Sequence, residues 1–82
     1  MTATNLLEVN LLDLLGAGCT VSQRKFEGNH YLDVRFRNTH ILPGVYVFHF
    51  DPTTLIAVLI GNDKAIINIA NELGSCAHIS TN

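Results

Sequence analysis

The sequence predicts an α+β fold of two layers, in which two helices pack on one face of a mainly antiparallel sheet of three or four strands. Residues 5–15 and 63–73 carry apolar side chains at helical spacing. The stretch between them contains short runs of β-branched and aromatic residues bounded by turn dipeptides. The short connections between these runs favour antiparallel pairing. The expected order of elements is therefore α-β-β-β-(β)-α.

The composition is that of one small folded domain covering residues 1–82. Apolar residues make up 48% of the chain and charged residues only 15%, which excludes intrinsic disorder. The formal net charge of −2 argues against a protein that binds nucleic acid through an overall positive charge. A chain this short buries a marginal core, and such cores are commonly supplemented by oligomerisation.

The chain shows no targeting or membrane signal. No segment reaches the roughly 20 apolar residues that a membrane-spanning helix requires. The leucine-rich N-terminus lacks a basic leader and is interrupted by Glu8 and Asp13, so we expect no signal peptide. Cys19 and Cys76 are too few for a secreted disulfide scaffold. We expect a cytoplasmic protein with free thiols, and a single Cys19–Cys76 bridge is the alternative.

Residues 5–15 read as the first helix. Asn5 can cap its N-terminus, and the charge of Glu8 suits the first turn. Gly16 and Gly18 then end the helix, because glycine accepts the left-handed conformation of a C-cap. Its apolar face is formed by Leu7, Leu11, Leu14 and Leu15.

Residues 20–38 read as a β-hairpin whose turn is Gly28-Asn29. This turn places Glu27 opposite His30 and fixes which side chains share a face. One face carries Val21, Gln23, Lys25, Leu32, Val34 and Phe36. The opposite face carries Arg24, Phe26, Tyr31, Arg35 and Arg37.

Three further elements follow the hairpin. Residues 45–50 read as a strand, and residues 77–80 as a short edge strand. Residues 63–73 form the second helix, which Asn62 or Asp63 caps and Gly74 ends. The uniformly apolar run 55–60 is ambiguous. Its β-branched residues favour a strand, but Asp51-Pro52 could also begin a helix there.

The later strands carry more apolar side chains than one layer of helices can cover. We therefore predict that the chain forms a homodimer through the uncovered sheet face or through an edge strand. In the alternative, run 55–60 is a helix that covers the second face within the subunit. The predicted self-association residues are Tyr46, Phe48, Phe50, Ile56 and Val58.

The charges are unevenly distributed. Residues 20–38 hold four of the five basic residues and sum to +2, whereas the remainder sums to −4. Arginine beside aromatic rings is typical of protein hot spots and also of single-stranded nucleic-acid sites. We predict that a partner protein binds Arg24, Phe26, Tyr31, Arg35 and Arg37.

Two other interpretations of the hairpin stay open. In the first, the same face binds single-stranded nucleic acid weakly. In the second, it is a solvated hairpin stabilised by a Phe26–Tyr31 cross-strand pair and an Arg24–Asp33 ion pair.

Motifs for catalysis or metal binding are weak. Cys76-x-His78 is the one close Cys/His pair, and it lacks the second pair that a zinc site needs. The sequence contains neither a glycine-rich phosphate loop nor a nucleophile elbow. So small a chain also leaves little room for a ligand pocket of about 300 Å³. We predict a non-enzymatic interaction module of adaptor or inhibitor type, without metal or cofactor.

Overall fold

The computed structural model begins with a strand where the sequence pattern predicted a helix. It describes residues 4–37, 41, 43–61 and 64–81. Strand β1 covers Asn5–Asn10, and only the short helix α1, Leu11–Gly16, remains of the predicted helix 5–15. Asn10 caps α1 in place of Asn5, since its side-chain oxygen accepts a hydrogen bond from the Leu12 amide at 2.8 Å.

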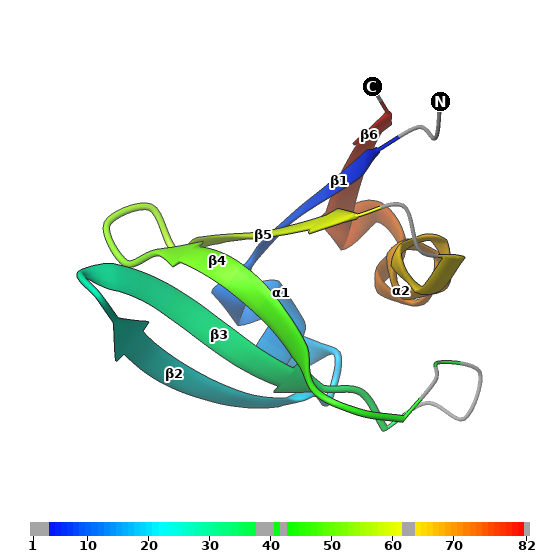
Figure 1. Ribbon diagram of the computed structural model, residues 1–82. Coiled ribbons are helices and arrows are strands. Elements are labelled where there is room, and N and C mark those ends of the chain that lie inside the picture. The colour runs from blue at the N-terminus through cyan, green and yellow to red at the C-terminus, as the bar shows by residue number, and fades with distance from the viewer. Residues whose placement is uncertain (1–3, 38–40, 42, 62–63, 82) are drawn as a thin grey trace.

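The sheet has six strands in the order β2-β3-β4-β5-β1-β6, and every neighbouring pair is antiparallel (Figure 1). The predicted fold class, with three or four strands and a helix first, is therefore wrong. The strands after β1 are β2 (Thr20–Phe26), β3 (Asn29–Arg35), β4 (Tyr46–Asp51), β5 (Ile56–Gly61) and β6 (Ala77–Thr81). Helix α2 covers Lys64–Leu73 and leads into the 3-10 helix η1, Gly74–Cys76.

The long-range position of β1 explains why helical spacing misled the prediction. Both edges of β1 are paired, with β5 on one side and β6 on the other. Its side chains alternate between buried Leu7 and Val9 and exposed Glu8, which is the period of two that a strand requires. Pairing on two sides satisfies the backbone and outweighs the helical preference of leucine.

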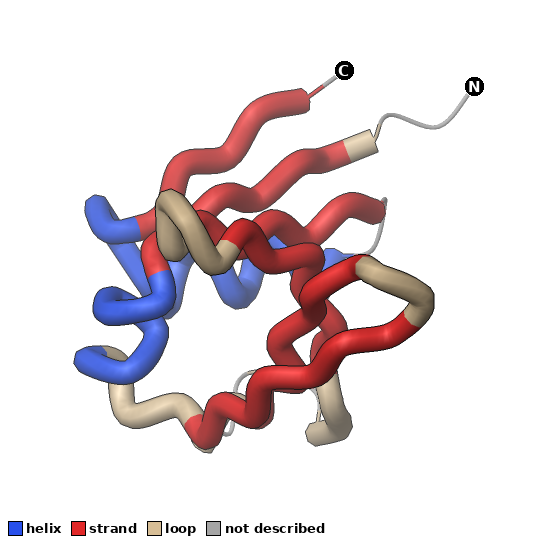
Figure 2. Tube along the Cα trace, turned by 90° about the vertical axis from the view of Figure 1, so that its left-hand side faces the viewer, coloured by secondary structure: helices blue, strands red, loops and turns tan. Residues whose placement is uncertain are grey.

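The sheet is sharply bent between β4 and β5. These strands pair over only three positions, ending at His49 opposite Val58. Beyond this ladder, β5, β1 and β6 diverge from β4, β3 and β2, and a second view shows the same bend (Figures 1 and 2). The core lies on the side of the sheet where α1 packs against β1 and β2, and α2 against β5, β1 and β6.

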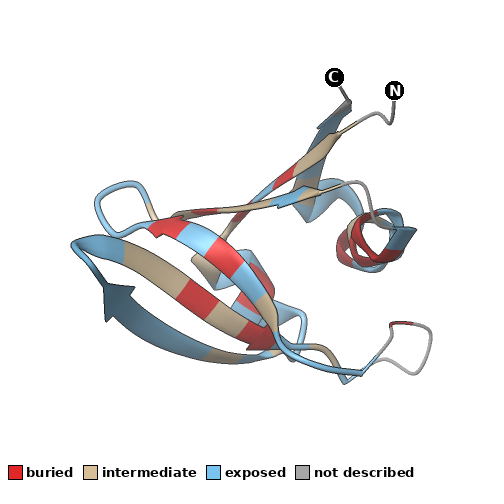
Figure 3. Cartoon of the chain, in the orientation of Figure 1, coloured by how far each residue is buried: buried red, intermediate tan, exposed pale blue. Residues whose placement is uncertain are grey.

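The buried residues form one cluster on this side, and burial alternates along the strands (Figure 3). The largest fully buried side chains come from three strands, β1, β3 and β4, and from both helices: Phe48, Leu7, Leu14, Leu32, Ile69, Val9 and Val34. Burying this apolar area from water is the main favourable term in folding. None of the helices in the described part of the chain combines the length and apolar character needed to cross a membrane.

The β2–β3 hairpin turns one residue earlier than predicted. Glu27 and Gly28 occupy the turn, with φ of 50° and 81°, so that Phe26 pairs with Asn29. Two consecutive positive φ angles are typical of a type I′ turn, which follows the twist of the strands. The predicted pairing of Glu27 with His30 is therefore wrong. Each residue nevertheless stays on its predicted face, because moving a two-residue turn by one position shifts every partner by two.

Run 55–60 lies almost entirely in strand β5, which confirms the strand interpretation over the helix. Leu55 precedes the strand at φ 64°, a left-handed conformation that strains a residue with a branched side chain. Two hydrogen bonds hold it there. Its amide donates to the Asp51 carbonyl at 2.7 Å, and its carbonyl accepts from the Leu11 amide at 2.9 Å.

The second helix and the C-terminal edge strand lie where the sequence predicted them, as α2 and β6. The predicted caps of α2, Asn62 and Asp63, lie outside the described residues, as does Asn38 at the end of the predicted hairpin.

Candidate functional site

The side of the sheet that faces away from the helices is the candidate site, and we call it the open face. One row of mutually opposite residues crosses all six strands on this face. From β2 to β6, the row contains Arg24, Tyr31, His49, Val58, Glu8 and His78.

Four of the five predicted partner-binding residues lie on the open face. Arg24 and Phe26 come from β2, and Tyr31 and Arg35 from β3. Arg37 is exposed just after the end of β3. The arrangement follows from the alternation of side chains in a strand, which is why the faces could be predicted without the correct turn.

A network of polar and aromatic side chains connects strands β2, β3 and β4 on the open face. The Arg24 guanidinium donates from Nε and Nη2 to the two carboxylate oxygens of Asp33, at 3.0 Å each. The guanidinium carbon lies 5.5 Å from the centroid of the Tyr31 ring, and that ring lies 5.3 Å from the His49 ring. Asp33 raises the already high pKa of Arg24, mainly through the hydrogen bond. The charge of Arg24 is therefore compensated locally.

The predicted cross-strand pairs of the hairpin need adjustment. Arg24 and Asp33 form the predicted ion pair, but they sit diagonally, because Arg24 is directly opposite Tyr31. Phe26 is directly opposite Asn29, so the predicted direct pairing of Phe26 with Tyr31 is wrong. Phe26 is left 57% exposed near the hairpin tip.

The predicted self-association residues divide between the two faces. Phe48 and Phe50 are 0% and 8% exposed in the core, and Tyr46 packs against the same cluster. These aromatic residues cannot form an uncovered patch, because the β3–β4 register sets Phe48 opposite buried Leu32. Ile56 and Val58 do lie on the open face, since their partners on β1 are Asn10 and Glu8.

An apolar patch on β5 and β1 was only partly foreseen. Ile56, Val58 and Ile60 follow one another on the open face of β5, and Leu6 lies opposite Ile60. Ile60 is 54% exposed. Ile60 could have been found from the sequence, because it continues the period of two set by Ile56 and Val58. Leu6 could not, since residues 5–10 were read as helix. We refer to Leu6, Ile56, Val58 and Ile60 as the apolar patch.

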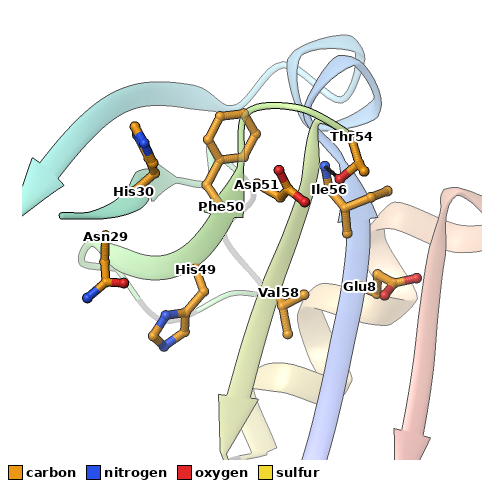
Figure 4. Close-up of a pocket in the computed structure, with 9 residues that line it drawn as sticks. All are labelled: Glu8, Asn29, His30, His49, Phe50, Asp51, Thr54, Ile56 and Val58. Carbon is orange, nitrogen blue, oxygen red and sulfur yellow. Dashed lines mark hydrogen bonds between the residues drawn. The ribbon is translucent and has the colours of Figure 1, made fainter.

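A hollow of about 480 Å³ opens where the β3–β4 ladder ends at Tyr31 and His49 (Figure 4). Its volume exceeds what the length of the chain led us to expect. Ile56 and Val58 of the apolar patch line it. The polar groups that face it include Glu8, His30, His49 and Asp51.

The Asp51 carboxylate at the rim of this hollow is held in its charged form. Its pKa lies below the ordinary value of 3.8, chiefly because the Thr53 amide donates to Oδ1 at 2.9 Å. Thr54 contributes further hydrogen bonds, and His30 a favourable charge interaction. The β4–β5 turn therefore presents an ionised carboxylate to the hollow at neutral pH.

The two cysteine thiols differ in exposure, since Cys19 is half-buried and Cys76 is exposed. Cys19 and Cys76 are both free. Burial, and to a lesser extent the nearby Glu72 carboxylate, raises the pKa of the Cys19 thiol, which disfavours the reactive thiolate. Across the residues that the structure describes, there is no cluster of three or more His, Cys, Asp or Glu side chains able to hold a metal ion.

Comparison of this chain with known protein families, curated proteins and solved structures finds no match. Any function must therefore be argued from the geometry of the open face itself.

Proposed function

We propose that this protein is a non-enzymatic protein-binding module that forms a homodimer through the open face of its sheet. One observation carries the proposal: the apolar patch of β5 and β1 lies on the side of the sheet that neither α1 nor α2 covers. Removing apolar surface from water contributes about 25 cal/mol per Å² before the cost of association. A domain this small has a limited core of its own. Covering the open face with a second copy of the chain would therefore add materially to its stability.

The rest of the open face has the composition of a protein interface. Arginine and tyrosine are enriched among the residues that dominate binding energies, and Arg24 and Tyr31 lie in the same row as Val58 of the apolar patch, with His49 between Tyr31 and Val58. Their mutual contacts and the ion pair with Asp33 hold these long side chains in place. Side chains that are ordered in advance lose less conformational entropy on binding.

A weak single-stranded nucleic-acid site on the same face is the second candidate, and it receives less support. Asp33 compensates Arg24, and the face also carries the carboxylates of Glu8 and Asp51. Binding to phosphates depends on uncompensated cations, and Arg35 is the one unpaired cation that the described strands place on this face. We place the protein in the cytoplasm, because its exposed free thiol Cys76 is compatible with a reducing compartment.

The proposal is tested by the oligomeric state in solution. Sedimentation velocity over a rising concentration series should show a dimer for the wild-type chain. Ile60→Asp should give a monomer, because it places a charge in the apolar patch at a residue that is 54% exposed and adds nothing to the core. A wild-type chain that stays monomeric at every concentration contradicts the proposal.

A matched control separates the open face from general surface hydrophobicity. Leu12 on α1 is 63% exposed on the helical side of the molecule. Leu12→Asp introduces the same charge and should leave the dimer intact. If Leu12→Asp dissociates the dimer while Ile60→Asp does not, the interface lies on the helices and the proposal is wrong.

The nucleic-acid alternative has its own test. Fluorescence anisotropy with a labelled single-stranded oligonucleotide at low salt should show no binding. Binding that weakens steeply with salt and is lost in Arg35→Glu/Arg37→Glu would favour the alternative over the proposed function.

A further inference from the structure

The hollow on the open face combines carboxylates with an apolar floor. Glu8 and Asp51 belong to β1 and β4, on either side of β5, which supplies Ile56 and Val58 (Figure 4). The registers put Glu8 opposite Val58 and Asp51 opposite Ile56. A ligand lying over β5 in this hollow would therefore have apolar contacts beneath it and a carboxylate toward each neighbouring strand.

The negative charge of the hollow is not compensated by a lysine or arginine side chain. Asp51 is held ionised by the turn that follows it. Glu8 is exposed, and within the described part of the chain it takes part in no ion pair. Neither lysine nor arginine is among the described residues that line the hollow, whose other titratable groups are the imidazoles of His30 and His49.

This chemistry suits a cation on an apolar stem. Lysine and arginine side chains lay their methylene groups along apolar surface and keep the charged end in a polar environment. In the hollow, the stem would contact Ile56 and Val58, and the head would bond to a carboxylate in a charge-assisted hydrogen bond.

The second copy of the chain carries cations of this kind. Arg35 lies on the open face of β3 and Arg37 just beyond its end; both are exposed, and neither forms an ion pair with any described residue. Neither of them lines the hollow of its own subunit. Residues 20–38 sum to +2, whereas the hollow carries the carboxylates of Glu8 and Asp51, so hairpin and hollow are complementary in charge. In a two-fold symmetric dimer, such a contact would form twice.

We propose that the hollow binds an arginine side chain, Arg35 or Arg37, from the β2–β3 hairpin of a second copy. The inference rests on the proposed homodimer and assigns the contact that orients its two subunits. Opposite charges in register select one arrangement of the copies over others, while the apolar patch supplies affinity.

Charge reversal with reciprocal mixing tests the contact. Glu8→Lys should raise the dimer dissociation constant roughly tenfold or more, because it replaces attraction by repulsion at both symmetric contacts. The double variant Arg35→Glu/Arg37→Glu should weaken its own dimer in the same way. A mixture of the two variants should form a heterodimer, because both of its contacts again join opposite charges.

A control and a salt series complete this measurement. Asp13→Lys makes a similar charge change on α1 and should leave the dissociation constant unchanged. Added sodium chloride should weaken the wild-type dimer by screening the contacts. If Glu8→Lys dimerises like the wild type, or if mixing restores nothing, the inference is wrong while the proposed homodimer stands.

The hollow can also be probed without reference to the dimer. Titration of n-butylammonium chloride into labelled protein should shift the amide NMR signals of Glu8, His49 and Val58, and n-pentanol should not reproduce the effect. Glu8→Gln should abolish the shifts, whereas the same change at Glu72 on α2 should preserve them. Unshifted signals, or shifts that survive Glu8→Gln, overturn the hollow as a cation site even if the protein dimerises.

Discussion

The two faces of the sheet use similar residues with opposite results. Leu6 and Leu7 are neighbours on β1, yet Leu7 is fully buried at 0% exposure while Leu6 lies in the apolar patch on the open face. Strand β5 divides in the same way, because Ala57 is buried whereas Ile60 is exposed. The difference comes from the helices, which supply a second layer to only one face. Apolar content alone therefore does not identify the core of this chain.

The helices do not cover the whole of the covered face. Gln23 and Lys25 of β2 point to the same side of the sheet as buried Leu32, yet both are exposed. The hairpin extends beyond the helices toward its Glu27-Gly28 turn (Figure 1), so both of its faces meet solvent there. The stability of this end depends on turn chemistry and cross-strand pairs more than on burial.

The strongest test of the difference between the faces is a matched pair of substitutions on β1. Leu7→Ala should lower the free energy of unfolding by about 2–5 kcal/mol, because it removes buried methyl groups and leaves a cavity. Leu6→Ala should lower it by less than about 1 kcal/mol, since Leu6 is not enclosed.

Urea denaturation measures both values, under conditions in which the protein is monomeric. Equal losses from the two alanine variants would mean that the open face is buried in the single subunit, and the contrast between the faces would then be false.

A smaller effect is expected at the hairpin turn, outside the reach of the helices. Glu27 has φ of 50°, which asparagine adopts more readily than glutamate. Glu27→Asn should therefore raise the free energy of unfolding by about 0.5–1 kcal/mol. Glu27→Ala is the control, because it removes the same charge without favouring a positive φ. A comparable gain in both variants would assign the effect to charge and not to backbone conformation.

The smallest effect concerns pH and the open face at the β4–β5 turn. The pKa of Asp51 is lower in the folded chain than its ordinary value of 3.8, so its ionised form stabilises the fold. This contribution is fully present above the unfolded pKa and is lost as the pH falls through the folded pKa. Asp51→Asn retains an oxygen for the Thr53 amide but not the charge.

The difference in thermal stability between wild type and Asp51→Asn should therefore be constant near neutral pH and shrink in acid below about pH 4. A difference that stays the same down to the lowest pH at which the protein folds would remove the charge of Asp51 as its cause.

Much of the hairpin half of the site could be predicted from sequence. Side chains alternate along a strand, so Arg24, Tyr31 and Arg35 were assigned to one face although the turn was misplaced. The Arg24–Asp33 ion pair was foreseen on the same ground. The hollow was not, because it depends on where the β3–β4 ladder stops and how β4 turns toward β5. Those features depend on how separate strands pair in the folded chain, and no local sequence pattern shows where such a pairing ends.

The sequence by itself determined the local elements of this protein: the β2–β3 hairpin at a glycine turn, strand β5 with its β-branched residues, and the amphipathic helix α2. The tertiary structure alone decided that residues 5–10 form a central strand, since β5 and β6 pair with both of its edges. It also decided that the aromatic side chains of β4 enter the core while Ile56 and Val58 face outward. Apolar periodicity shows which residues avoid water, but only the packing of distant segments decides which of them the second layer covers.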